Sequence, residues 1–454
     1  MTTLGIVEQA TGIEAVTALV EQRIVAGSDW ELASIRRSFV RLEPPRFYWV
    51  VYRVRLQRHA AGNGGAVEGS TEQRVLHLAG RACFDPGDWR DFRQRLVATY
   101  GEARFDPLGD LGYPILFDQT QYALWCFPVD PTLTTLPAAI DVVAMRRLLR
   151  RQRSQLPVEG ARIGGVAIEP VRYLPEMSAT LRYRVEVGGS QQVDLFGSVR
   201  RGDAGAEMDR VMRGLWELSQ RSDGALRVPR PLGYHPDLRL RLEEAVSGDT
   251  VSGDRTAPEF AAAALAAADA LAVIHDSDLD APSELLLEAE LVRLDSVLDQ
   301  FALTHPSAHP LLRQLLSHIR SQLGRTPEEE WVPTHGDCKY DQFVEHDGAF
   351  YLVDFEDAGA AETSWDLGKF CAHAVPSMPA GWEDTAAADD ARRAFLERYR
   401  ELRPHATLQR FPVYEATHLA SRAMVAMWSQ LRGWRDAAEV LLVVAMERLR
   451  SQAP

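Results

Sequence analysis

Two aspartates on either side of a strand-rich segment are the residues of this sequence best placed to do chemistry. Asp337 ends the run His335-Gly336-Asp337, and Asp354 follows the apolar residues 351–353. Between them, His346-Asp347-Gly348 interrupts β-branched and aromatic residues, which is typical of a hairpin turn. Because a hairpin brings its two ends together, we expect both carboxylates to face one pocket. One could orient or deprotonate a hydroxyl group and the other could bind a metal ion, which is the arrangement that phosphoryl transfer requires.

The composition is ordinary for a globular protein. The 454 residues suggest two or three folding units, with 46% hydrophobic and 25% charged residues. Fifty basic against 64 acidic side chains give a net charge of −14, which disfavours a nucleic-acid partner or an anionic membrane. The four cysteines lack the paired short spacing of a zinc site or a disulfide framework. They are Cys83, Cys126, Cys338 and Cys371.

The N-terminal segment carries no recognisable targeting signal. It lacks a basic region followed by a long apolar run, and no stretch of the sequence approaches 18 uninterrupted apolar residues. We therefore expect a reduced, cytoplasmic protein.

Two strand-rich segments precede the hairpin and share a pattern. Residues 40–44 (Val-Arg-Leu-Glu-Pro) recur as 171–175 (Val-Arg-Tyr-Leu-Pro), and Tyr52-Arg53-Val54 recurs as Tyr183-Arg184-Val185, both at an offset of 131 residues. Each copy then reaches a strand with a glycine and an amphipathic helix. We interpret this as an internal duplication of a β-β-α-β-β unit. The alternative is a chance likeness between two small mixed sheets.

Helical periodicity dominates the sequence after about residue 257, apart from the hairpin, and it predicts one amphipathic helix over residues 284–301. The organisation that follows has three segments. Residues 1–150 form an N-terminal α+β unit, 151–250 a second mixed-sheet unit with a connector, and 251–454 a helical region containing the hairpin.

This order resembles the aminoglycoside-phosphotransferase-like kinases, a branch of the protein-kinase-like fold that includes small-molecule kinases. The family has His-Gly-Asp, then Asn after four more residues, and a metal-binding Asp on the next strand. Here His335-Gly336-Asp337 matches, Gln342 replaces the Asn, and Asp354 stands at the metal-binding position. Trp365-Asp366-Leu367 matches a downstream structural Asp. The resemblance covers about residues 155–375.

The resemblance implies an α+β, bilobal protein-kinase-like fold with a mixed-sheet N-lobe and a helical C-lobe. Residues 1–150 lie outside this minimal fold. They are an extra α+β unit that the repeated pattern makes a candidate duplicate of the N-lobe.

The resemblance also assigns roles around the hairpin. Asp337 is the candidate catalytic base, whose main task is to orient the acceptor hydroxyl. Asp354 and Gln342 are candidate ligands of Mg²⁺, which prefers oxygen donors. Lys339 could contact the transferred phosphoryl group, or it could be a solvated loop lysine. His335 belongs to the same loop and is expected to brace it by hydrogen bonds rather than to transfer protons.

The mixed-sheet unit departs from the family pattern. A lysine often follows the strand glycine and pairs with a Glu of the next helix, but Ser198 follows Gly197 here. Arg200, which shares the strand parity of Ser198, and Arg184 on the preceding strand could supply the charge instead. Glu207 is the candidate ion-pair partner. Each of these charges could equally be an ordinary surface charge.

No Gly-rich loop is present to cover the nucleotide phosphates. The segment 175–179 is the candidate replacement, in which Ser178 and backbone amides would bind the phosphates. Backbone groups near Glu244 and Val246, in the connector, could bind the adenine as hinge residues do in the family.

We therefore expect an ATP- and Mg²⁺-dependent phosphotransferase that acts on a hydroxyl of a small polar molecule, such as a sugar, an amino sugar or an aminoglycoside. Glu362 and Asp366 are candidates to attract a cationic acceptor. One alternative is a peptide Ser/Thr kinase that uses residues 1–150 for docking. Another is a catalytically impaired kinase-like protein that binds nucleotide or a partner, for which Ser198 and Gln342 argue. No nucleic-acid or membrane partner is expected, and the oligomeric state is left open.

Overall fold

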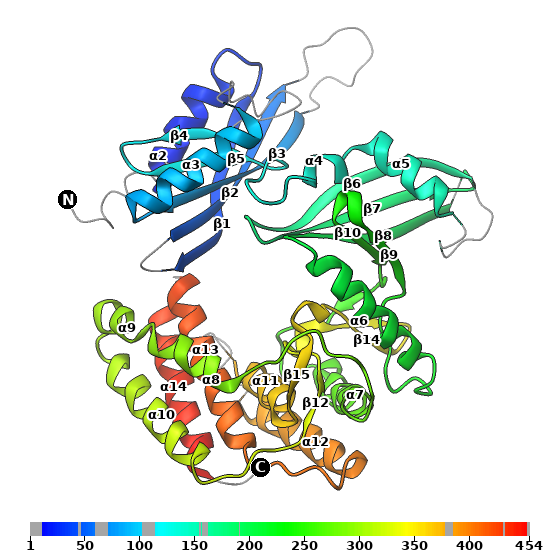
Figure 1. Ribbon diagram of the computed structural model, residues 1–454, viewed down its shortest axis with the longest axis vertical. Helices are drawn as coiled ribbons and strands as arrows, with labels where there is room; N and C mark the ends of the chain where they lie inside the picture. Colours follow the sequence, from blue (N-terminus) through cyan, green and yellow to red (C-terminus); the bar gives the residue numbers. More distant parts are fainter. Residues whose placement is uncertain are drawn as a thin grey trace. The chain divides into compact units, whose positions relative to one another are not determined.

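The computed structural model describes residues 11–43, 47–59, 71–101, 114–153, 156, 162–189, 191–376, 385–429 and 432–451 (Figure 1). The chain forms two compact units. The first comprises Met1–Gly205 and Tyr234–Arg241, and the second comprises Ala206–Gly233 and Leu242–Pro454. The two five-stranded sheets belong chiefly to the first unit and the helical region to the second. The boundary expected near residue 150 therefore falls inside the first unit.

The first sheet is antiparallel and has helices on both faces. Its strands are β1 (Glu31–Glu43), β2 (Phe47–His59), β3 (Thr71–Cys83), β4 (Ile115–Phe117) and β5 (Tyr122–Cys126), in the order β1-β2-β3-β5-β4. Alternate residues of β2, including Val50 and Val54, pack in one core with Val16 and Val20 of α2 (Ile13–Val20). On the other face, Phe92 of α3 (Pro86–Tyr100) lies against a tryptophan of β5.

The second sheet repeats this order. Its strands are β6 (Ile163–Leu174), β7 (Ser178–Val187), β8 (Gln191–Arg200), β9 (Pro231–His235) and β10 (Leu240–Glu244), in the order β6-β7-β8-β10-β9. Trp49 of β2 is opposite Arg81 of β3, and Thr180 of β7 is opposite Ser198 of β8. A shared strand order is what a duplication predicts, although the duplication itself stays a hypothesis.

The second unit is mostly helical and has two hydrophobic cores. One is built around α7 (Pro258–His275), α11 (Ser364–Ala374) and α12 (Thr385–Leu402), the other around α8 (Leu287–Asp295), α10 (Ala308–Leu323), α13 (Phe411–Ser429) and α14 (Trp434–Ser451). By length and composition α7 could cross a membrane. In this fold, however, Phe260 and Leu271 of α7 lie buried in the first of these cores.

One predicted helix, residues 284–301, is two helices in the structure. α8 ends at Asp295, and α9 (Leu298–Thr304) begins after a short break. The hydroxyl of Ser296 donates to the carbonyl oxygen of Arg293 at 2.7 Å. A serine that bonds to nearby backbone in this way competes with the regular helix pattern, which explains why the apolar periodicity alone gave one helix.

The predicted hairpin is confirmed as β13 (Phe343–His346) and β14 (Ala349–Leu352). Asp347 and Gly348 form its turn with φ of 50° and 73°, as a two-residue type I′ turn requires. Asp337 follows another strand, β12 (Trp331–Thr334), which pairs with β15 (Gly359–Glu362). The two aspartates thus follow strands of two different small sheets.

Candidate active site

The loop that carries Asp337 begins where β12 ends, and Gly336 fixes its course. Gly336 has φ of +82°, and a Cβ atom there would lie 1.9 Å from the carbonyl oxygen of Asp357. Only glycine fits a position with both properties. The loop before Asp337 is therefore packed directly against the turn that follows Asp354.

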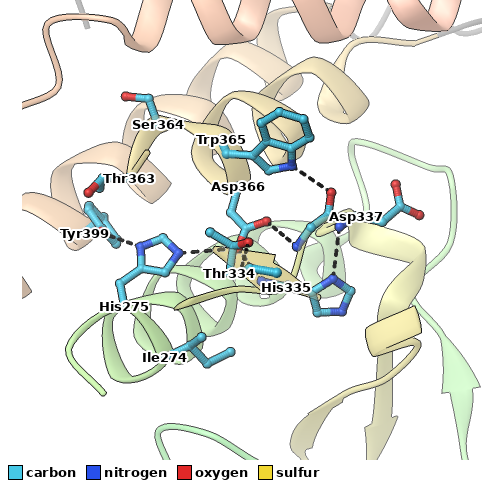
Figure 2. Close-up of polar contacts among 12 residues, drawn as sticks. Ile274, His275, Thr334, His335, Asp337, Thr363, Ser364, Trp365, Asp366 and Tyr399 are labelled. Atoms are coloured by element: carbon cyan, nitrogen blue, oxygen red, sulfur yellow. Dashed lines mark hydrogen bonds and ion pairs between the residues drawn. The ribbon is translucent and has the colours of Figure 1, made fainter. Parts of the chain in front are cut away.

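Helix α11 holds the same loop through Asp366, whose carboxylate is fully buried. The backbone N–H of His335 donates to Oδ2 at 2.7 Å and that of Gly336 to Oδ1 at 2.9 Å (Figure 2). Nε2 of His275 lies 3.3 Å from Oδ2, and its Nδ1 lies 2.7 Å from the hydroxyl of Tyr399. Burial would raise the pKa of Asp366, but the contact with His275 and the other bonds outweigh it and lower that pKa. Asp366 thus has the structural role expected of it.

His335 braces the loop. Its Nδ1 accepts from the backbone N–H of Asp337 at 3.3 Å, so Nε2 carries the proton and donates to the carbonyl oxygen of Val353 at 3.0 Å. The ring is fully buried and packs against Phe355. Both nitrogens are engaged with backbone, so His335 connects the two aspartate loops and is not placed to move a proton.

The carboxylate of Asp337 is held on both oxygens by lysines. Nζ of Lys339 lies 2.7 Å from Oδ2, and Nζ of Lys369 on α11 lies 3.0 Å from Oδ1. Burial alone would raise the pKa of Asp337, but the charges of Lys369 and Lys339 outweigh it and hold that pKa well below its usual range. Asp337 is therefore a fixed carboxylate at any physiological pH.

Lys369 is the site residue that the sequence interpretation missed. It lies three positions after Asp366, so both residues point from the same side of α11 toward the loop. A signal was available, because Lys339 and Lys369 are the only lysines among the chain's 50 basic residues. In a chain that otherwise uses arginine, two lysines on one carboxylate indicate that this site needs compact point charges rather than planar forks.

Two arginines and a histidine lie at the C-terminal end of α11, the helix that carries Lys369. Burial lowers the pKa of His373 well below its usual value, aided by Arg422 and Lys369, so this imidazole is neutral. The guanidinium of Arg422 donates to the carbonyl oxygens of Ala372 and Val375, the latter at 2.8 Å. Arg255 donates to the carbonyl oxygens of Ala374 and His373. The two arginines thus place further positive charge next to the end of α11.

Asp354 and Gln342 lie together, as their proposed metal role requires. Nε2 of Gln342 donates to Oδ2 of Asp354 at 3.1 Å, and the backbone N–H of Val353 donates to the carbonyl oxygen of Gln342 at 2.9 Å. Asp354 lies just after β14 and has φ of 66°, in the left-handed region. The charges of both Asp337 and Asp354 act on Lys339, where they outweigh burial and raise its pKa. The two aspartates therefore converge on one region.

This pair fits a magnesium ion of the kinase type. Within the described residues, no group of three or more His, Cys, Asp or Glu side chains surrounds a possible metal position. A site that shares its Mg²⁺ with nucleotide phosphates does not need such a group, because one or two carboxylates suffice. A carboxylate and a side-chain amide oxygen are suitable hard donors, and the Gln342 amide can present its oxygen by rotating about its last bond.

Two acidic residues expected to attract a cationic acceptor are not available to do so. Glu362 is buried, accepts from the backbone N–H of Glu329 at 2.9 Å and pairs with Arg410 at 2.6 Å. Asp366 is used by the loop. That expectation is wrong, because both carboxylates are consumed by internal bonds that strand and helix patterns do not reveal.

In the second sheet, the register brings some of the nucleotide candidates together and separates another. Ser178 is directly opposite Arg200, and Ser198 is opposite Thr180, so these residues share one face near the β6–β7 turn. Arg184 is on the same face but lies six residues along β7 from Ser178, about 20 Å at strand spacing. Its guanidinium is 2.8 Å from Glu169. Arg200 is thus the better placed of the two arginines.

The remaining candidates have other partners within the second unit. Glu207 of α6 (Ala204–Ser219) lies 4.0 Å from Arg210 on the same helix and is half exposed. The backbone N–H of Glu244 donates to the carbonyl oxygen of Arg230 at 2.9 Å, so that donor is not free for an adenine. A hinge contact would have to use the Glu244 carbonyl group or the backbone of Val246.

The chain is similar to known phosphotransferases in sequence and in fold. A family model described as a phosphotransferase enzyme family matches residues 178–405, half of the chain. No curated protein sequence matches. A structure from Ralstonia eutropha, provisionally described as an aminoglycoside phosphotransferase, is similar with a TM-score of 0.50 at 16% identity, over 68% of this chain and 98% of that chain. At this identity the likeness shows the fold, which is kinase-like.

Two further structures are similar over the same share of this chain. One is a choline kinase from Streptococcus pneumoniae, with a TM-score of 0.45 at 13% identity, over 68% of this chain and 99% of that chain. The other is a choline/ethanolamine kinase family protein from Mesorhizobium loti, with a TM-score of 0.45 at 16% identity, over 68% of this chain and 98% of that chain.

Proposed function

Because the chain belongs to the phosphotransferase enzyme family, we propose that it transfers the γ-phosphoryl group of ATP to a hydroxyl of a small polar acceptor. The observation that carries this proposal is the Asp337 carboxylate, fixed on both oxygens by Lys339 and Lys369. A carboxylate held in this way is suited to position a hydroxyl for attack on phosphorus.

Asp337 acts by orientation in this mechanism. Its pKa is held low, so it is a weak base in the ground state. In a loose phosphoryl-transfer transition state, the acceptor proton is lost late and little base strength is needed. A lone pair of Asp337 would accept the hydroxyl hydrogen bond and align the oxygen, while the ammonium of Lys339 would meet the developing negative charge.

Asp354 and Gln342 would hold Mg²⁺ together with the nucleotide phosphates, and the ion would supply charge neutralisation there. In the second sheet, Ser178 and Arg200 are the residues proposed to bind phosphate, and the connector around Val246 is proposed to bind adenine. Ser198 leaves the usual lysine position without a charge, and the guanidinium of Arg200 would replace it from the same face of the sheet.

The acceptor is proposed to be a neutral or acidic polyhydroxyl compound, such as a sugar or sugar acid. Lys339 and Lys369 place positive charge on Asp337, Arg255 and Arg422 add positive charge at the end of α11, and Glu362 is paired internally. A cationic acceptor would be repelled there, because like charges in a site of low dielectric constant are costly. Aminoglycosides and amino sugars are accordingly the less favoured members of the class.

The test is ATP turnover with Mg²⁺ over a panel of neutral sugars, sugar acids, amino sugars and aminoglycosides. Asp337→Asn and Asp354→Asn should each lower kcat by at least about 100-fold on the best acceptor. Asp347→Asn is the matched control, because it lies in the turn of the same hairpin, its side chain is 91% exposed, and Asn tolerates its positive φ. Turnover that survives the first two substitutions would refute the mechanism.

A second candidate function rests on Ser198, since a missing charge at that position is compatible with a kinase-like protein that binds nucleotide without turning it over. The same panel separates the two. If the protein binds nucleotide but turns over no acceptor, and Asp337→Asn leaves the nucleotide Kd unchanged, the result would favour a protein that binds nucleotide without catalysis.

A further inference from the structure

The turn between β6 and β7 rests against the N-terminal sheet. It comprises residues 175–177, has no glycine, and contains Glu176 with φ of 62°. A non-glycine residue in this left-handed conformation persists where its surroundings determine it. The residues that contact Glu176 here belong to the segment 47–133, which has no assigned role in phosphoryl transfer.

Arg81 of β3 provides the main contact. Its Nη1 lies 2.8 Å from each carboxylate oxygen of Glu176, and Nε1 of Trp49 donates to Oε2 at 2.8 Å. The side chains of Arg81 and Glu176 are only 6% and 10% exposed. The guanidinium lies over the rings of Phe47 and Phe92, at 3.8 Å and 4.2 Å from their centres. This ion pair is shielded from water, so removal of either partner would leave an unpaired buried charge, which is costly.

Asp130 holds the backbone of the same turn. It is fully buried, and its Oδ2 accepts from the N–H of Glu176 at 2.9 Å and from the hydroxyl of Tyr173 at 2.7 Å. That hydroxyl in turn accepts from Nε1 of Trp125 at 2.8 Å. The other oxygen of Asp130 accepts from the N–H groups of Thr132 and Leu133. Side chain and backbone of Glu176 are thus fixed independently.

The position of Arg81 connects this contact to the nucleotide site. Arg81 follows Gly80 and is opposite Trp49, just as Ser198 follows Gly197 and is opposite Thr180. In the first sheet, the residue at this position is a buried cation, and it binds the turn of the second sheet. In the second sheet the charge is absent. The cation that the first sheet carries at this position thus contacts the turn of the second sheet, where the corresponding position has no charge.

We propose that Arg81 and Asp130 are positioning residues, through which the N-terminal unit holds the β6–β7 turn and the adjoining Ser178 ready for the nucleotide phosphates. This rests on the proposed function. Glycines give a Gly-rich loop wide backbone freedom, whereas this turn is held by an ion pair and a buried carboxylate. Preorganisation of this kind increases affinity because the ligand does not have to order the loop.

The test uses the full chain and measures nucleotide binding directly, by titration calorimetry with ATP and with ADP in Mg²⁺, alongside KM and kcat. Arg81→Met should raise the Kd and KM for ATP by about tenfold and change kcat by less than about threefold. Hydrogen exchange at the N–H groups of residues 176 and 177 should rise, while exchange in the middle of β7 stays constant. Arg93→Met is the control, since Arg93 pairs with Asp118 at the partly exposed surface of the same unit.

Conservative variants keep the test decisive if Arg81→Met does not fold. Arg81→Lys keeps the positive charge beside Glu176 but loses the guanidinium that lies over Phe47 and Phe92, so its Kd for ATP should fall between those of the wild type and Arg81→Met. Asp130→Asn and Glu176→Gln keep the shape but weaken the contacts, and both should raise that Kd.

The outcomes separate the two proposals. Wild-type protein that binds neither ATP nor ADP would overturn the proposed function and this inference with it. This inference alone would be overturned if the wild-type protein binds ATP and either Arg81→Met or Glu176→Gln has the same Kd for ATP and the same hydrogen exchange at the turn. A loss of kcat at unchanged KM for ATP would also refute it, because a positioned phosphate loop acts on nucleotide affinity.

Discussion

Lys369→Met is the substitution that tests the centre of the site most sharply. It removes the ammonium that lies 3.0 Å from Oδ1 of Asp337 and keeps the aliphatic chain, on a side chain that is 20% exposed. The loss of one hydrogen bond between charged groups at a partly buried site corresponds to about 1.5–3 kcal/mol. If Lys369 serves only to hold Asp337 in its reactive orientation, this free energy is lost from the transition state. Since about 1.4 kcal/mol is tenfold in rate, kcat should fall roughly 10- to 100-fold.

The assay is steady-state ATP turnover on the best acceptor, with kcat and KM separated, in the wild-type and Asp337→Asn backgrounds. Lys369→Met should lower kcat in the first and have little further effect in the second, because residues that act as one unit are not additive. Lys369→Arg keeps the charge and should recover part of the rate. Arg398→Met on α12, which breaks the pair with Asp269 of α7, is the control for helix stability. An unchanged kcat in Lys369→Met, or an equal loss in both backgrounds, would refute the reasoning.

Three further predictions concern the same site. Gly336→Ala should destabilise the protein by about 3 kcal/mol or more in urea unfolding and abolish turnover, because its Cβ would lie 1.9 Å from a carbonyl oxygen; wild-type stability would contradict this. ATP with Mg²⁺ should stabilise the folded protein by about 2.7 kcal/mol when its concentration is 100 times its Kd, and the Tm should rise accordingly. Asp354→Asn should remove the share of this Tm increase that depends on Mg²⁺. Asp337 and Asp366 have folded-state pKa values below the ordinary 3.8, so their stabilisation is complete above that pH and is lost as the pH falls further toward the folded values. Urea unfolding between about pH 5 and 2 should therefore show a steeper loss for the wild type than for Asp366→Asn.

The arrangement of the candidate residues around Asp337 and Asp354 could be predicted from the sequence because its parts are local. Asp347-Gly348 specifies a tight turn, and the turn sets the register that brings Gln342 beside Asp354. His335 and Asp366 follow from spacing along one loop and one helix. Turns and short loops of this kind depend mainly on the backbone conformations that their individual residues favour.

The rest depends on contacts between residues far apart in the chain, which no local pattern records. Arg81 and Glu176 are separated by 95 positions, and Arg410 and Glu362 by 48. Each pairing is set by how strands and helices pack after they form. A list of charged residues therefore did not show that Glu362 is buried or that Arg184 is already paired with Glu169.

The scarcity of lysine has a consequence for chemical labelling. Amine-selective reagents such as succinimidyl esters have only two side-chain targets in this chain, Lys339 and Lys369, both within 3.0 Å of the Asp337 carboxylate. Their side chains are 21% and 20% exposed, so a small reagent can reach them. Acylation would convert each cation into a neutral amide, and peptide mass spectrometry would report occupancy of the site without an activity assay. By the same chemistry, metabolic acyl donors would modify this protein nowhere on its side-chain amines except at the centre of its site.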